Sequence, residues 1–112
     1  MIAVKIFMDS SGRYRGFRVS GHAGCGRAGT DIVCAAVSVL AQNTVNAIES
    51  FTEDDISYSV EEGYLDCLFT GGVSKESKLL MDTLVLGFEG IRDSYQADRK
   101  KKQIIQIVTE EV

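Results

Sequence analysis

The segment Asp31-Ile32-Val33-Cys34-Ala35-Ala36-Val37-Ser38 begins a long helical pattern. Apolar residues recur at helical spacing from here to about Ser50, which predicts a helix with a wide apolar face. Thr30 or Asp31 is the expected N-cap, because a side-chain oxygen there can accept from the unpaired N–H groups of the first turn. The preceding loop, from Gly21 to Thr30, carries glycines at 21, 24, 26 and 29 and is therefore expected to move.

Strand patterns flank this segment on both sides. Apolar and polar residues alternate before and after the turn cluster Asp9-Ser10-Ser11-Gly12, which predicts a hairpin. A second pair of strand-like runs joins across Glu61-Glu62-Gly63. The expected elements are strands at 2–8 and 14–20, a helix at 31–50, strands at 56–60 and 64–70, a helix from an N-cap at Ser74 to about Tyr95, and a strand at 104–109.

The order ββαββαβ predicts an α+β fold of two layers. We expect a mostly antiparallel five-stranded sheet with both helices packed on one face, since each amphipathic helix needs an apolar partner surface. A chain of 112 residues fits one domain, spanning 1–112. The other sheet face, with residues such as Phe7 or Phe17, is expected to be covered by a second subunit. Gly87 and Gly90 are expected where the neighbouring helix packs close.

Composition limits the functional classes. The formal net charge is −4, so the chain lacks the positive field expected of a nucleic-acid-binding protein. The basic run Arg99-Lys100-Lys101-Lys102 is interpreted as cations at a helix end, with nucleic-acid or ribosome contact as the alternative. No segment is expected to reach the roughly 20 apolar residues of a membrane span. Three irregularly spaced cysteines indicate thiols in a reducing compartment, the cytoplasm, with Cys67 a small buried hydrophobe.

His22 and Cys34 together can supply nucleophilic catalysis. With Asp31 as N-cap, Cys34 falls in the first helical turn, where the helix dipole and unpaired N–H groups favour a thiolate. His22, the single histidine, is then the general base and later the acid to a leaving amine, and first-turn N–H groups can hold an oxyanion. Asp31 could orient His22, cap the helix or bind a substrate amine, and Ser38 lies one turn beyond Cys34.

Three other motifs compete for the same loop. Gly24-Cys25-Gly26-Arg27-Ala28-Gly29 matches GxGxxG, but that pattern belongs to a parallel βαβ unit and the strands here are expected in hairpins. A phosphate-binding loop would require Lys-Ser or Lys-Thr after Gly29, where Thr30 stands. His22, Cys25, Cys34 and Asp31 could ligate zinc, although their spacing fits no common zinc module.

A recognisable pattern begins with Gly21-His22-Ala23, continues through a variable loop and ends with Gly29 and the segment Asp31-Ile32-Val33-Cys34-Ala35-Ala36-Val37-Ser38. This pattern resembles the ribosomal-processing cysteine protease (Prp) family of bacteria. The resemblance covers the full length and implies a cytoplasmic endopeptidase without metal or cofactor. It implies a dyad of His22 as base and Cys34 as nucleophile, with Asp31 and Ser38 assisting or shaping the substrate pocket. Cys25 is not part of the family pattern.

The resemblance also implies partners. Members of the family are homodimers that remove the N-terminal extension of large ribosomal subunit protein twenty-seven at an apolar and aromatic motif, so an apolar pocket is expected. The glycine-rich loop, with Gly21, Gly24 and Gly29, would order over that substrate, and neither a membrane nor direct nucleic-acid contact is required. The alternative from another class is a non-catalytic dimeric binding module for a ribosomal protein or RNA, in which Cys34→Ala would leave function intact.

Overall fold

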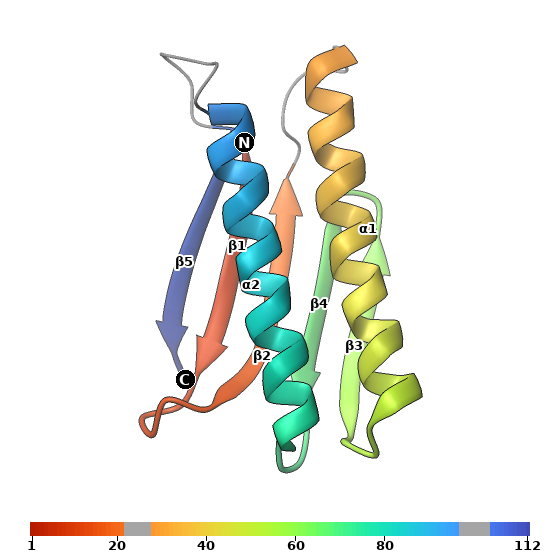
Figure 1. Ribbon diagram of the computed structural model, residues 1–112, viewed down its shortest axis with the longest axis vertical. Coiled ribbons are helices and arrows are strands. Elements are labelled where there is room, and N and C mark those ends of the chain that lie inside the picture. Colours follow the sequence, from red (N-terminus) through yellow and green to blue (C-terminus); the bar gives the residue numbers. More distant parts are fainter. Residues whose placement is uncertain (22–27, 97–103) are drawn as a thin grey trace.

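A computed structural model describes residues 1–21, 28–96 and 104–112 of the chain. Two helices lie side by side across one face of a five-stranded sheet (Figure 1). The strand order is β3-β4-β2-β1-β5, with β1 and β5 parallel and the other neighbours antiparallel, which confirms the predicted fold class. The elements are β1 (Ile2–Met8), β2 (Tyr14–Gly21), α1 (Ala28–Phe51), β3 (Ile56–Glu61), β4 (Tyr64–Phe69), α2 (Lys75–Gln96) and β5 (Ile105–Glu111).

The hydrophobic core lies between the sheet and the two helices. Strand pairing aligns Ile6 of β1 with Phe17 of β2, and Phe17 with Cys67 of β4, so these three side chains share the helix-facing side. Phe17 and Cys67 are fully buried there, together with Phe88 of α2. The helices contribute their own apolar stripes: Val33, Val37, Ala41, Val45 and Ile48 from α1, and Met81, Leu84 and Phe88 from α2.

The opposite sheet face differs from the expectation at one residue. Phe17 does not lie on that face, because its register with Ile6 turns it toward the helices. Phe7 does lie there, but it is only 5% exposed, and the guanidinium of Arg18 sits 5.3 Å from its ring centroid. Exposed apolar side chains on this face come instead from Leu68 and Val108.

The N-terminus of α1 also differs from the prediction. The helix begins at Ala28, so Thr30 and Asp31 lie inside its first turn and neither is the N-cap. Gly29, expected in the loop, is likewise helical. The prediction for α2 is confirmed, since Ser74 precedes Lys75 and its Oγ accepts from the backbone N–H of Ser77 at 3.1 Å.

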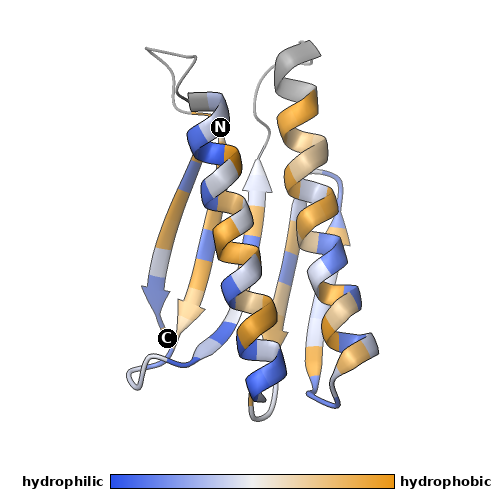
Figure 2. Ribbon diagram, in the orientation of Figure 1, coloured by the Kyte–Doolittle hydropathy of each residue, from blue (hydrophilic) through white to orange (hydrophobic). Residues whose placement is uncertain are grey.

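α1 is long and apolar along most of its length (Figure 2). Its segment Ile32–Phe51, 20 residues, reaches the length and mean hydropathy of a membrane span, contrary to the sequence-based expectation. One face of this helix packs on the sheet, as a core helix of that composition does. The helix pair approaches closely at Gly87, where a Cβ would lie 2.5 Å from Leu40 Cδ2, whereas Gly90 has no such neighbour within 4 Å.

Candidate active site

A groove of about 300 Å³ runs between α1 and one end of the sheet. Its α1 side consists of Cys34, Ala35, Val37, Ser38, Ala41 and Gln42. The opposite side is built where β1, β2 and the β3–β4 hairpin meet, from Ile2, Val19, Gly21, Val60, Gly63 and Leu65. Helical spacing explains the first set, because residues three and four apart line one face of a helix.

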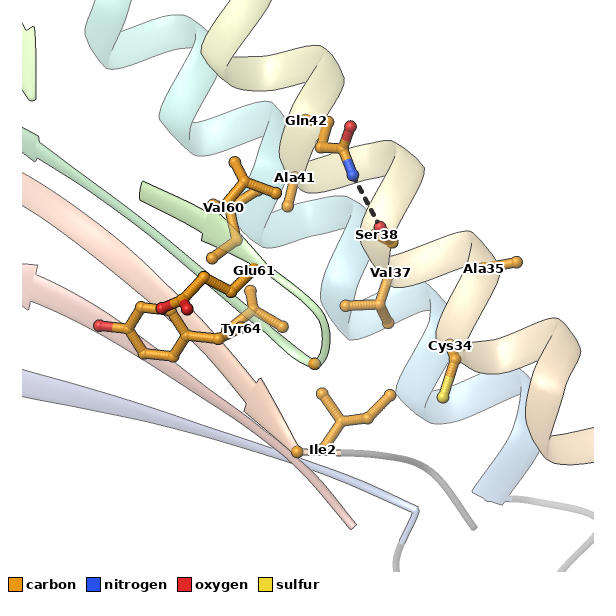
Figure 3. A pocket seen from close by; sticks show the side chains of 14 residues that line it. Ile2, Cys34, Ala35, Val37, Ser38, Ala41, Gln42, Val60, Glu61 and Tyr64 are labelled. Carbon is orange, nitrogen blue, oxygen red and sulfur yellow. Dashed lines mark hydrogen bonds between the residues drawn. The ribbon is translucent and has the colours of Figure 1, made fainter. Parts of the chain in front are cut away.

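Cys34 lies at one end of this groove, with Ile2 across from it (Figure 3). It comes six residues after Ala28, the first helical residue, and therefore lies in the second turn of α1, not the first turn as predicted. The strongest effect of a helix dipole is confined to the terminal turn, so direct activation by the helix end is weaker than expected. The half-buried thiol points from the helix into the groove, on the side where Ile2 lies (Figure 3).

The lining of the groove is mostly apolar. Val37 and Ala41 are almost completely buried beneath it, while Val60 is 49% exposed along its β3 side. Glu61 and Tyr64 also border the groove, but they pair with each other across β3 and β4 on the sheet face that points away from the helices (Figure 3). The apolar pocket implied by the family resemblance is therefore present beside Cys34.

Ser38 and Gln42 supply the polar side-chain atoms of the α1 wall, apart from the Cys34 thiol, in the part of the chain that the structure describes. The Gln42 side-chain N–H donates to Ser38 Oγ at 3.0 Å (Figure 3). Ser38 was among the predicted site residues, and the structure places it in the groove one turn from Cys34. Gln42 was missed, although its spacing of eight residues from Cys34 puts it on the same helix face.

Gly21 is the last residue of β2 and forms part of the groove wall. Its φ is +93°, and a Cβ would lie 2.5 Å from the carbonyl oxygen of Met1, so the position requires glycine. Its backbone N–H donates to the carbonyl of Gly63 at 3.0 Å, which ties β2 to the β3–β4 turn. The predicted site residue Gly21 thus lies in the groove wall, where it permits close approach of three chain segments.

The remaining predicted site residues divide into two groups. His22 and Gly24, with Cys25, lie outside the described residues, so the position of His22 relative to Cys34 stays a prediction. Gly29 and Asp31 belong to the first turn of α1.

Cys67 is the second described cysteine, and its surroundings confirm that it is a buried hydrophobe. It is fully buried in the core on β4. Burial raises the pKa of its thiol to about 12, and the carboxylates of Asp66 and Glu49 act in the same direction. A thiol in this state is a poor nucleophile at neutral pH, which leaves Cys34 as the reactive candidate of the two.

Comparisons with known proteins agree with this geometry. Residues 1–100 match the protein-family model described as cysteine protease Prp. The chain is 31% identical over 97 residues to the ribosomal processing cysteine protease Prp of Staphylococcus aureus strain Mu50, covering 85% of this chain and 92% of that one. The same protein of strain NCTC 8325 matches equally well.

Solved structures show the same fold. The essential ribosomal processing protease Prp from S. aureus, in complex with a covalently linked product peptide, superposes with a TM-score of 0.83 at 25% identity and covers 98% of this chain and 100% of that one. A crystal structure from Streptococcus mutans superposes with a TM-score of 0.78 at 25% identity, over 100% of this chain and 96% of that one.

Proposed function

Because this chain belongs to the cysteine protease Prp family, whose relatives are ribosomal processing proteases, we propose that it removes the N-terminal extension of large ribosomal subunit protein twenty-seven. The chain is a cysteine protease. We assign Cys34 as its nucleophile and His22 as its general base. The observation that supports this assignment best is the position of Cys34, half-buried at the end of an apolar groove and directed into it.

The proposed reaction has two halves. In the first, His22 takes the proton of Cys34, the thiolate attacks the scissile carbonyl carbon, and the C–N bond breaks as His22 returns the proton to the leaving amine. A thioester then joins Cys34 to the N-terminal part of the substrate. In the second half, His22 removes a proton from water, the hydroxide attacks the thioester, and the carboxylate product leaves while the thiolate is restored and then reprotonated.

The oxyanion of each tetrahedral intermediate needs N–H donors. The first-turn N–H groups of α1 lack helical partners, and Cys34 lies in the next turn of the same helix, which supports their use as donors to a carbonyl attacked by Cys34. The Gly21 N–H is not available for this role because it already donates to Gly63. We propose that Asp31 and Ser38 assist the dyad or shape the pocket, and that the loop with Gly24 and Gly29 orders over bound substrate.

The groove chemistry supports a particular cleavage motif. Its side chains are chiefly valine, isoleucine, leucine and alanine, and burying apolar substrate surface against them contributes roughly 25 cal/mol per Å². Apolar and aromatic substrate residues next to the scissile bond are therefore the proposed motif. Glu61 is the charged residue of the described groove lining, and its pairing with Tyr64 places it on the far sheet face, so basic or acidic substrate residues at these positions would lose hydration and bind poorly.

We propose that the protein is a cytoplasmic homodimer. The protease would encounter a ribosomal protein precursor in the cytoplasm. Cell fractionation tests this location. The sheet face opposite the helices is the proposed interface, because Leu68 and Val108 are 39% and 42% exposed there beside Arg18 and Lys5. Light scattering should give twice the chain mass of 12.2 kDa, and a monomeric mass would contradict the dimer.

The proposed function is tested by incubation with a synthetic peptide that spans the extension and the first mature residues of the same organism's protein twenty-seven. Mass spectrometry should show cleavage by the wild-type protein and none by Cys34→Ala or His22→Ala, while circular dichroism shows that both variants fold. Asn43→Ala, an exposed change on α1 outside the groove lining, is the matched control and should cleave normally. An intact peptide after incubation with wild-type protein would contradict the proposal.

A further inference from the structure

Three side chains form a line along the α1 wall of the groove. Cys34, Ser38 and Gln42 are spaced four residues apart, so they lie on one face of the helix. At 1.5 Å per residue the line from Cys34 to Gln42 is about 12 Å long. An extended peptide rises about 3.3 Å per residue, so a substrate lying along this wall spans the distance with roughly three to four residues.

A peptide in this groove has to replace the water on its main-chain N–H and C=O groups. Most of the wall cannot do so, because Val37, Ala41, Val60 and Leu65 present apolar side chains. The main-chain groups of α1 beside the groove are engaged in the hydrogen bonds of the helix itself. Each buried peptide group left without a partner would weaken binding. In the described residues the partners are the open edge of β3, whose main chain pairs only with β4, and on the α1 wall the few polar side chains.

Gln42 has the atoms for this task. An amide side chain has two N–H donors and one carbonyl oxygen, and the bond to Ser38 Oγ uses one N–H. That bond holds the side chain against the groove wall before substrate arrives, which reduces the ordering cost of binding. Ser38 accepts in this bond and keeps its own O–H as a donor.

We propose that Gln42 is a positioning and specificity residue that hydrogen-bonds the substrate main chain three to four residues from the scissile bond. The inference rests on the proposed function, with Cys34 as the attacking atom. Gln42 fixes the register of the peptide, so that the bond to be cut lies over the thiol. It acts in binding, and its loss raises KM more than it lowers kcat.

The test measures peptide binding independently of turnover. Fluorescence anisotropy would compare Cys34→Ala with Cys34→Ala/Gln42→Met, using a labelled protein-twenty-seven peptide that extends six residues to each side of the cleavage site and a short form that keeps two. Methionine preserves the length of the side chain and removes its hydrogen bonds. Cys34→Ala/Asn43→Met is the control, because it replaces an exposed amide side chain of α1 that does not line the groove.

We expect Gln42→Met to weaken binding of the long peptide about 3- to 10-fold and to leave the short peptide unchanged, with the control equal to its parent. An equal loss for both peptides, no loss for either, or no binding of the long peptide would overturn the role of Gln42. A different result would show that the proposed function is wrong and leave the role of Gln42 standing. In that case the long peptide binds tightly and Gln42→Met weakens its binding as expected, but the wild-type protein does not cleave the peptide.

Discussion

Replacement of Gly21 by alanine should destabilise the protein because two separate costs meet at this position. Its φ of +93° lies in the left-handed region, where an L-residue costs roughly 1–2 kcal/mol. A Cβ would also lie 2.5 Å from the Met1 carbonyl oxygen, so the start of β1 must shift, at about 1–3 kcal/mol. The expected loss in the free energy of unfolding is therefore about 2–5 kcal/mol.

Two other glycines separate these costs. Gly12 has a φ of +81° with nothing within 4 Å of a Cβ, so Gly12→Ala should lose only about 1–2 kcal/mol. Gly72 has an equally open surrounding and no positive φ, so Gly72→Ala should be neutral or stabilise by up to about 1 kcal/mol. Urea unfolding of the three variants measures the series. A Gly21→Ala loss equal to that of Gly12→Ala would refute the steric part of the account.

Two further predictions concern the core and the start of α2. Phe17→Ala should lower the free energy of unfolding by about 3–5 kcal/mol, as measured with urea, because Phe17 packs between the sheet and the helices. Phe7→Ala should lower it clearly less, because Phe7 lies on the opposite face under Arg18. Equal losses of stability would contradict this assignment of the two sheet faces. Burial alone would raise the pKa of Asp54, but hydrogen bonds from Ser77 and from Ser74, the latter two at 2.9 and 2.7 Å, hold the pKa of this carboxyl below its ordinary value. Because the pKa of Asp54 is lower in the folded state than in the unfolded state, its carboxylate stabilises the folded protein above the unfolded pKa, and this stability is lost as the pH falls below about 4. The variant Asp54→Asn should therefore lose less stability on acidification, as measured by circular dichroism. If the acid unfolding curve of the variant equals that of the wild type, Asp54 makes no such contribution.

Local patterns predicted most of the fold. The alternation in β1, the turn at Asp9 and the Ser74 cap depend on neighbouring residues, so the sequence was sufficient for them. The start of α1 was predicted three residues late, because Gly29 has poor helix propensity and nonetheless lies inside the helix. The face of Phe17 depends on its pairing with Ile6, which period-two patterning within one strand cannot fix.

For the candidate site, too, the residues of one segment could be predicted from the sequence, whereas residues that tertiary contacts bring in could not. Cys34 and Ser38 were identified from their own segment, and helical spacing would also have identified Gln42. Ile2 and Val60 were not expected in the groove, because only the strand order brings β1 and the β3–β4 hairpin beside α1. Tertiary contacts between distant segments therefore decide which apolar residues form the pocket.

The proposed catalysis requires the Cys34 thiolate to form a thioester with the substrate. Acid quenching during turnover of the precursor peptide, followed by proteolytic mapping in a mass spectrometer, identifies which cysteine carries the acyl group. We predict an adduct on Cys34, with none on Cys67, whose thiol is buried and has its pKa raised to about 12. An acyl group on Cys25 or Cys67, or continued turnover by Cys34→Ala, would contradict the claim.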